Sequence, residues 1–195
     1  HLSGIALLLI DLQQGLVDAQ PYQWPQVCDH IQQLLADARR LGIPVIHVQH
    51  QSPPDTMLAV GSAGWQIVPE LAPLPGEPVF AKTHNSAFKQ TGLHDHLQRQ
   101  GIDSLVVTGM QTEYCVETTV RVAFEYGYRL YVPQMTNTTL DRGDWSAQAL
   151  YQHHNFDIMQ DRFAHMPTVA EMMSIMAQHP RHRAEDGMTI EPNPN

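Results

Sequence analysis

Three residues in this sequence carry side chains that could act together in hydrolysis. Cys115 offers a thiol, whose deprotonated form is a strong nucleophile. Lys82 offers a cation for a thiolate or an anionic intermediate, and Asp11 offers a carboxylate that could move a proton from the thiol to a leaving amine. Each residue also has an ordinary interpretation: a buried cysteine, a solvated lysine and an aspartate that begins a turn. Their relative positions must decide between the two interpretations.

Short apolar runs place all three residues near the ends of predicted strands. The predicted strands are Ile5–Ile10, Pro44–Val48, Val79–Ala81, Ser104–Thr108, Arg129–Val132 and Phe156–Met159. Asp11 directly follows the first strand, Lys82 directly follows the third, and Cys115 comes shortly after the fourth. The loop Gln49–Pro78 is longer than compact domains usually leave without secondary structure, which favours a functional role for it.

Helical periodicity fills the intervals between these strands. The predicted helices run from Pro25 to a stop at Gly42, from a Thr91 cap to Gly101, over Thr112–Tyr126 with Gly127 at the end, over Asp144–His154 and over Thr168–Ala177. Repeated β-α-β units predict an α/β fold with a doubly wound, mainly parallel six-stranded sheet and helices on both faces. Ligands bind such folds at the carboxyl ends of the strands. Asp11, Lys82 and Cys115 are therefore predicted to share one sheet edge.

The two cysteines are predicted to differ in role. Cys115 falls in the first turn of a helix, at the N3 position if Thr112 is the cap. Unpaired N–H groups and the positive helix end favour a thiolate there, and such placement can lower a thiol pKa from about 8.5 toward 3.5–7.5. Cys28 lies within an amphipathic helix, far from any strand end, and is predicted to be structural.

Composition excludes several classes of protein. The chain has 195 residues and a formal net charge of −9, which argues against nucleic acid as a partner. The longest apolar run, Ile5–Ile10, is far below the roughly 20 residues of a membrane span, and we expect no secretory signal. We expect one domain over residues 1–179, a polar tail over 180–195, free thiols in a cytoplasmic location, and a homo-oligomer.

Three segments together resemble a known family. They are Asp11-Leu12-Gln13, then Lys82 followed by Ser86-Ala87-Phe88, then Gly109-Met110-Gln111-Thr112-Glu113-Tyr114-Cys115-Val116 with Thr119. In this order and spacing, over about Ile5 to Phe163, they resemble the isochorismatase-like cysteine hydrolases, which include nicotinamidases and N-carbamoylsarcosine amidohydrolase.

The resemblance implies a Rossmann-like three-layer α/β/α sandwich and a catalytic triad. It implies Asp11 as general base, Lys82 as electrostatic partner and Cys115 as nucleophile. It also implies a cis peptide bond between Met110 and Gln111, which aims the backbone N–H groups of Gln111 and Cys115 into an oxyanion hole. No cofactor is expected.

Two segments depart from the family pattern. Nicotinamidases bind a metal through an Asp-x-His pair after the second strand, where this chain reads His47-Val48-Gln49-His50-Gln51. His47, His50 and His84 could converge, but no tight ligand spacing stands out, so we predict no metal site. After the fifth strand the family often has Asp-Ala, whereas this chain has Met135-Thr136, so substrate contacts are expected to differ.

The favoured function is cysteine-dependent hydrolysis of an amide, ureide or carbamoyl C–N bond in a small molecule, through a thioester-type intermediate. The predicted pocket has an apolar wall of Leu16, Trp65, Phe88 and Tyr114, with His50 and His84 orienting a polar group. Ordinary core or rim packing is the alternative for each of these residues. Two other functions stay open: vinyl-ether hydrolysis of isochorismate, and a non-catalytic binding or redox-sensing protein with Cys115 as an oxidisable thiol.

Overall fold

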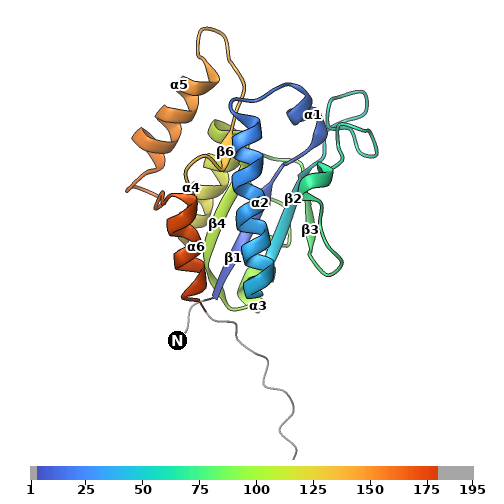
Figure 1. The fold of residues 1–195 in the computed structure, drawn as a ribbon. Helices are drawn as coiled ribbons and strands as arrows, with labels where there is room; N and C mark the ends of the chain where they lie inside the picture. The colour runs from blue at the N-terminus through green and yellow to red at the C-terminus, as the bar shows by residue number, and fades with distance from the viewer. Residues whose placement is uncertain (1–3, 180–195) are drawn as a thin grey trace, which may run out of the picture.

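A parallel sheet forms the centre of the protein (Figure 1). The computed structural model describes residues 4–179. The strands are β1 (Gly4–Ile10), β2 (Val45–His50), β3 (Val79–Lys82), β4 (Ile102–Met110), β5 (Arg129–Tyr131) and β6 (Asn137–Thr138). Their order is β3-β2-β1-β4-β5, β6 also pairs with β4, and every pair is parallel. The predicted six-stranded parallel sheet is therefore confirmed.

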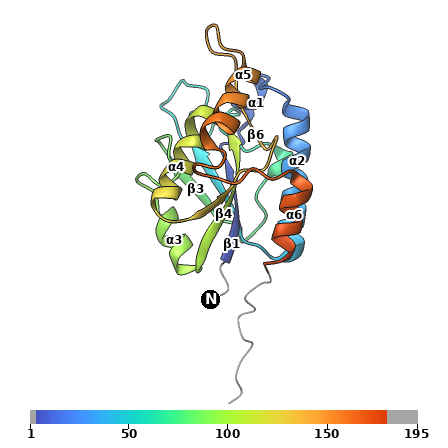
Figure 2. The same cartoon turned by 90° about the vertical axis from the view of Figure 1, so that its left-hand side faces the viewer.

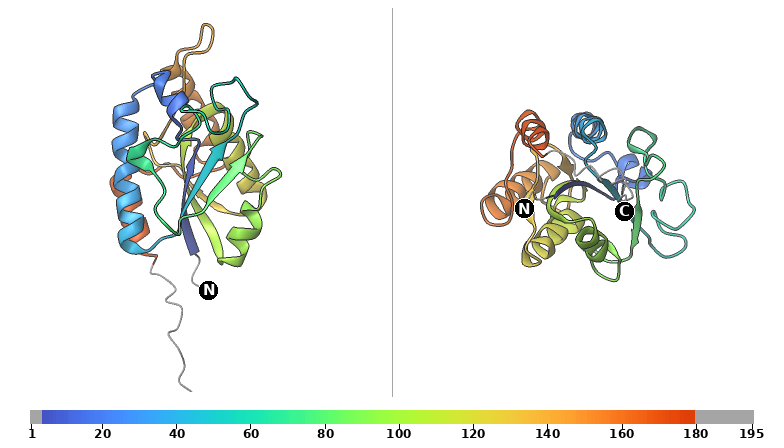
Figure 3. Two further views of the ribbon diagram at one scale, coloured as in Figure 1. Left: turned by 90° about the vertical axis from the view of Figure 1, so that its right-hand side faces the viewer. Right: turned by 90° about the horizontal axis from the view of Figure 1, so that it is seen from below.

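Helices cover both faces of this sheet, giving three layers (Figure 2). The helices are α1 (Gln14–Asp18), α2 (Trp24–Leu41), α3 (Leu93–Arg99), α4 (Glu117–Glu125), α5 (Ala147–Gln152) and α6 (Val169–Ala177). Helices α2 and α6 lie on one face, and α3 and α4 lie on the other, as the view along the strands shows (Figure 3). The predicted α/β/α sandwich is confirmed.

Strand β1 explains why two hydrophobic cores form. Ala6, Leu8 and Ile10 pack in the core beneath α3 and α4. Ile5, Leu7 and Leu9 pack in the core beneath α2 and α6. Successive side chains of a strand point to opposite faces, so a continuous apolar run supplies both cores.

Several predicted helix boundaries match the structure. Pro25 lies in the first turn of α2, and Gly42 ends the helix at a φ of 70°, the left-handed conformation that glycine adopts at little cost. Thr168 caps α6 in a capping box with Glu171. No helix within residues 4–179 is long and apolar enough to cross a membrane. The predicted tail, 180–195, lies outside the described residues.

The sixth strand was predicted at the wrong place. Residues Phe156–Met159 belong to η3 (His153–Met159), a π-helical segment that continues directly from α5. The helix predicted over Asp144–His154 begins only at Ala147, with Ser146 as its cap. A short apolar run cannot be assigned to strand or helix by periodicity alone. The true sixth strand, β6, is made of buried polar residues, which no hydrophobic pattern indicates.

A cluster of charged side chains holds the long loop between β2 and β3 at the end that leads into β3. It contains one short 3₁₀ helix, η1 (Pro69–Leu71). Glu77 lies 2.7 Å from Arg39 on α2 and 2.8 Å from the ring of buried His47 on β2. Glu77 also accepts a hydrogen bond from the Leu74 N–H at 3.0 Å. Burial acts to raise the pKa of Glu77, but hydrogen bonds from Arg39, His47 and Leu74 lower it to about 2.

We predict that Glu77→Gln lowers the free energy of unfolding by about 1–3 kcal/mol at pH 7, because charge-assisted hydrogen bonds are weakened. A folded pKa near 2 against an unfolded value near 4.5 means that the unfolded chain binds the proton more tightly. The difference between the two proteins should be full above pH 4.5 and should shrink as pH falls toward 2. Urea denaturation at several pH values measures this, with exposed Glu70→Gln as the matched control. An equal effect at all pH values would contradict it.

Candidate active site

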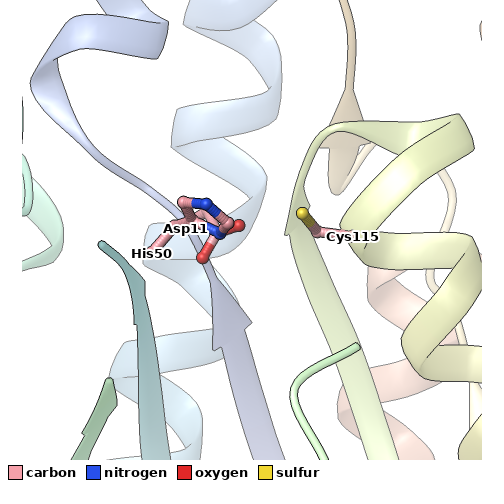
Figure 4. A group of neighbouring side chains, drawn as sticks. All are labelled: Asp11, His50 and Cys115. Carbon is pink, nitrogen blue, oxygen red and sulfur yellow. The ribbon is translucent and has the colours of Figure 1, made fainter. Parts of the chain in front are cut away.

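The register of the strands brings four reactive residues to one edge of the sheet. Asp11 follows β1, and Ile10 pairs with both Val48 of β2 and Gly109 of β4. His50 and Lys82 end β2 and β3 and pair with each other. Strand β4 leads through Gln111 into η2 (Thr112–Val116), a π-helical turn that carries Cys115. Figure 4 shows the Cys115 sulfur pointing from this turn toward Asp11 and His50.

Lys82 lies at the centre of this group. Its side chain is fully buried, and its Nζ is 2.9 Å from Asp11 Oδ2, 2.8 Å from His50 Nδ1 and 3.2 Å from Cys115 Sγ. It also donates to the carbonyl oxygen of His84 at 2.9 Å. The structure therefore brings the three residues of the predicted triad into direct contact through one ammonium group.

The thiol of Cys115 is not activated in the resting protein. Burial raises its pKa to about 12, the negative charge of Asp11 acts in the same direction, and the charge of Lys82 opposes both. The expectation of a low pKa at a helix start was therefore wrong. Thr112 is not the cap; its hydroxyl donates to Asn137 at 2.6 Å, and Cys115 is the fourth residue of a π-turn. Burial and a nearby carboxylate outweigh the helix end.

Asp11 has the features of a proton acceptor. Its side chain is buried, and burial raises its pKa, against the opposing charge and hydrogen bond of Lys82. Oδ2 contacts Lys82, while Oδ1 is buried without a hydrogen-bond partner among the described residues. An unpaired buried acceptor costs free energy, so it is available to a proton or to a ligand N–H. The backbone of Asp11 is left-handed, with a φ of 51°.

A small cavity of about 200 Å³ opens at this point. It is lined by Asp11, Leu16, His50, Ser52, Leu58, Asn85, Gln111, Tyr114 and Cys115. A larger hollow of about 520 Å³ lies at the amino ends of β2 and β3, around Glu77 and Pro78, and contains none of the triad. Of these two cavities, only the smaller one is lined by Asp11 and Cys115.

Half of the predicted pocket residues line this cavity. Leu16, His50 and Tyr114 do. Trp65 instead contributes its carbonyl oxygen to Gln13 and Gln49. Phe88 is buried in an aromatic cluster of the core, and His84 meets Lys82 through its backbone.

Sequence reasoning missed Ser52, Leu58 and Asn85 as lining residues. Ser52 and Leu58 belong to the long loop, whose functional role was expected without any residue being assigned. Asn85 lies between Lys82 and the Ser86-Ala87-Phe88 segment, so its position within that motif was the available signal.

The peptide bond between Met110 and Gln111 is cis, as the family resemblance implies. Among the described residues, no acceptor is found for the Gln111 N–H, which follows this bond at the cavity wall. A buried polar network binds η2, the turn that follows this peptide bond. Thr112 donates to Asn137, and Asn137 exchanges hydrogen bonds with Asn155 of η3 at 2.8 and 3.0 Å. Asn137 directly follows Met135-Thr136, the segment that departs from the Asp-Ala pattern.

A metal ion fits this site poorly. Within residues 4–179, one group of three or more candidate ligands is found, formed by Asp11, His50 and Cys115 with ligand atoms within 4.8 Å of one another. The Lys82 ammonium already contacts all three side chains and supplies the positive charge there. His47, considered as a ligand from the sequence, is bound to Glu77 instead.

Comparison with known proteins identifies the family of this chain. Residues 5–171 match the isochorismatase domain. The chain belongs to the isochorismatase family. A solved isochorismatase from Pseudomonas putida KT2440 is 32% identical, with a TM-score of 0.82 over 87% of this chain and 90% of that one. The family resemblance inferred from the three sequence segments is thereby confirmed.

Two similar proteins are named as a hydrolase and an amidohydrolase. A streptothricin hydrolase of Streptomyces noursei is 36% identical over 139 residues, covering 70% of this chain and 50% of the relative. A ureidoacrylate amidohydrolase of Stutzerimonas stutzeri is 36% identical over 124 residues, covering 59% and 49%. The chain thus spans about half the length of these relatives.

Proposed function

We propose that this protein is a cysteine hydrolase that cuts an amide, ureide or carbamoyl C–N bond of a small molecule. The observation that carries the proposal is the buried contact of Asp11, Lys82 and Cys115 beside a small cavity. The name of the ureidoacrylate amidohydrolase supports hydrolysis of an amide bond, and the name of the streptothricin hydrolase supports hydrolysis in general.

The first half of the proposed reaction forms a thioester. Asp11 takes the proton of Cys115, and the sulfur attacks the carbonyl carbon. The backbone N–H groups of Gln111 and Cys115 donate to the resulting oxyanion, an interaction commonly worth about 2.7–4 kcal/mol per donor. Asp11 then returns its proton to the leaving nitrogen, the C–N bond breaks, and ammonia or an amine departs.

The second half releases the acyl group. Asp11, again ionised, takes a proton from water, and the hydroxide attacks the thioester carbon. The C–S bond breaks, the proton held by Asp11 returns to the sulfur, and a carboxylic acid leaves. The thiol and the carboxylate are restored, so no oxidant or reductant is consumed.

Lys82 makes the proton transfer feasible in a buried site. Moving the proton from Cys115 to Asp11 shifts a negative charge from an oxygen to a sulfur. Lys82 Nζ contacts both groups, at 2.9 and 3.2 Å, so the charge stays beside the same cation. No new unpaired charge is created in the interior, where such a charge is costly.

The two alternative functions predict different observations from those expected for C–N hydrolysis. Vinyl-ether hydrolysis would release pyruvate and would not require the thiol. Redox sensing needs an accessible thiol with thiolate character. Cys115 is instead buried with a pKa raised to about 12, which disfavours that role.

We also propose a homo-oligomer in the cytoplasm. Cys28 and Cys115 are both free thiols, which suits a reducing compartment. Closed symmetric assemblies are common among enzymes of this size. Gel filtration with light scattering measures the assembly directly.

The test is ammonia release from a panel of small uncharged amides and ureides. We expect turnover by the wild type, and a loss of about 10⁴-fold or more in Cys115→Ala. Cys28→Ala, which changes the half-buried thiol on α2, is the matched control and should retain turnover. Full turnover in Cys115→Ala, or pyruvate in place of ammonia, would refute the proposal.

A further inference from the structure

His50 makes a contact with Lys82 that determines where its own proton lies. An ammonium group has three N–H donors and no acceptor. Lys82 Nζ lies 2.8 Å from His50 Nδ1, so this nitrogen must be the acceptor. The ring proton of a neutral histidine then sits on Nε2. Burial and the charge of Lys82 lower the pKa of His50, which favours the neutral ring.

The backbone of His50 is held in place independently of its ring. The fully buried side chain of Gln13 accepts from the His50 N–H at 3.0 Å and donates to the His50 carbonyl at 2.9 Å. Gln13 belongs to the Asp11-Leu12-Gln13 segment but is not a member of the triad, so the sequence analysis assigned no role to it. His50 therefore lines the cavity with a fixed backbone and a fixed Nδ1 contact.

Two amide side chains of the cavity, Gln111 and Asn85, offer N–H donors, while the hydroxyls of Ser52 and Tyr114 can donate or accept. Gln111 Oε1 accepts from Arg142 at 3.1 Å, and its amide N–H groups have no acceptor among residues 4–179. Asn85 Oδ1 faces the Cys115 sulfur at 3.8 Å, so the amide N–H groups of Asn85 also stay available in this part of the chain. The fixed acceptor is Asp11 Oδ1.

These lining groups define the complementary ligand. The N–H groups of His50, Gln111 and Asn85 are complementary to acceptor oxygens of a ligand. The free carboxylate oxygen, Asp11 Oδ1, can accept from the N–H of a scissile amide. Beyond the Asp11–Lys82 pair, no lining side chain of the described cavity supplies a free cation for a carboxylate. The cavity measures about 200 Å³, so the part of the ligand that it holds is small.

We infer that His50 Nε2–H binds a second carbonyl oxygen of the substrate, next to the one that Cys115 attacks. This inference rests on the proposed C–N hydrolysis and names its substrate class: small, uncharged amides or ureides with two carbonyl oxygens close together. His50 is a specificity-determining residue in this reaction, and it cannot act as a base from Nε2.

The first arm of the test reads the tautomer without a substrate. The protein is labelled with ¹⁵N-histidine, and the His50 ring signals are assigned as those lost in His50→Gln, because twelve histidines are present. We expect a neutral ring with the proton on Nε2 at pH 7. A ring with its proton on Nδ1, or a doubly protonated ring, would overturn the inference.

The second arm compares acetoacetamide with butanamide, which differ by one carbonyl oxygen. His50→Leu should slow both, because Lys82 loses a partner, and should lower kcat/KM for acetoacetamide about tenfold more than for butanamide. His50→Gln keeps an acceptor for Lys82 and an N–H for the ligand, and should restore much of this difference. Thermal unfolding confirms that each variant is folded.

The two proposals fail in distinguishable ways. If the amides are cut and His50→Leu slows both by the same factor, the substrate inference is wrong and C–N hydrolysis stands. If neither amide is cut by the wild type, this pair counts against both proposals. Hydrolysis of other amides in the wider panel would then leave C–N hydrolysis standing and the substrate inference wrong. No hydrolysis of any amide would contradict both proposals.

Discussion

Asp11→Asn is expected to lower kcat for amide hydrolysis by about 10²–10⁴-fold and, at the same time, to lower the pKa of the Cys115 thiol below its value of about 12. The negative charge of Asp11 helps to raise that pKa, and its removal leaves Lys82 facing the sulfur. The variant would hold more thiolate than the wild type. It would still be slow, because no group remains to protonate the leaving nitrogen or to activate water.

These opposite changes separate a general base from a structural carboxylate. The thiol pKa is followed by the ultraviolet absorbance of the thiolate against pH, with Cys115→Ala as background, and kcat by ammonia release. In the wild type, activity should fall as pH drops through the raised pKa of Asp11, because the carboxylate must be ionised. Asp29→Asn, on the exposed side of α2, is the control. Retained turnover, or a higher thiol pKa in Asp11→Asn, would count against the role assigned to Asp11.

Gly109→Ala is expected to abolish folding or to lower the free energy of unfolding by at least about 4 kcal/mol. Gly109 has a φ of +127°, and an added Cβ would lie 2.0 Å from the carbonyl oxygen of Ile10. The atoms nearest to the added Cβ are backbone atoms of Ile10, which cannot turn away as a flexible side chain could, so the neighbouring strands β1 and β4 would have to separate. Any folded fraction should also lose turnover, because Ile10 leads to Asp11 and Gly109 leads to the cis peptide bond.

Gly101→Ala provides the matched control for this change. Gly101 also has a positive φ, of +65°, but nothing lies within 4 Å of an added Cβ. It should cost only about 1 kcal/mol of backbone strain. Urea denaturation and kcat measured on both variants compare the two effects. Similar losses at Gly101 and Gly109 would show that conformation, and not the close approach of β1 and β4, sets the requirement for glycine.

Much of the fold follows from local patterns in the sequence. The apolar run of β1, the amphipathic repeat of α2 and the stop at Gly42 each predict their element, because one short-range signal dominates each of them. The failures have the opposite character. Phe156–Met159 has the composition of a strand but continues a helix, and the strand Asn137–Thr138 is buried through hydrogen bonds to Thr112 and Asn155. Such polar burial depends on partners distant in sequence.

The sequence predicted that the residues of the candidate site lie together, but it did not predict their electrostatics. Strand ends and the rule for parallel sheets indicated Asp11, Lys82 and Cys115. The thiol pKa was predicted in the wrong direction, because helix position is local, whereas burial and the charge of Asp11 arise only in the assembled fold. The Lys82–His50 contact was missed for the same reason: it joins the ends of neighbouring strands separated by a long loop.

The most direct test of the account asks where the acyl group is carried. Excess wild-type enzyme is mixed with an amide substrate, quenched in acid during a single turnover, digested and examined by mass spectrometry. We predict that the peptide containing Cys115 gains the mass of the acyl group, and that the peptide containing Cys28 does not. Product formation with no acyl adduct on Cys115 at any time of quenching, or an adduct on another residue, would contradict the assignment of Cys115 as the nucleophile.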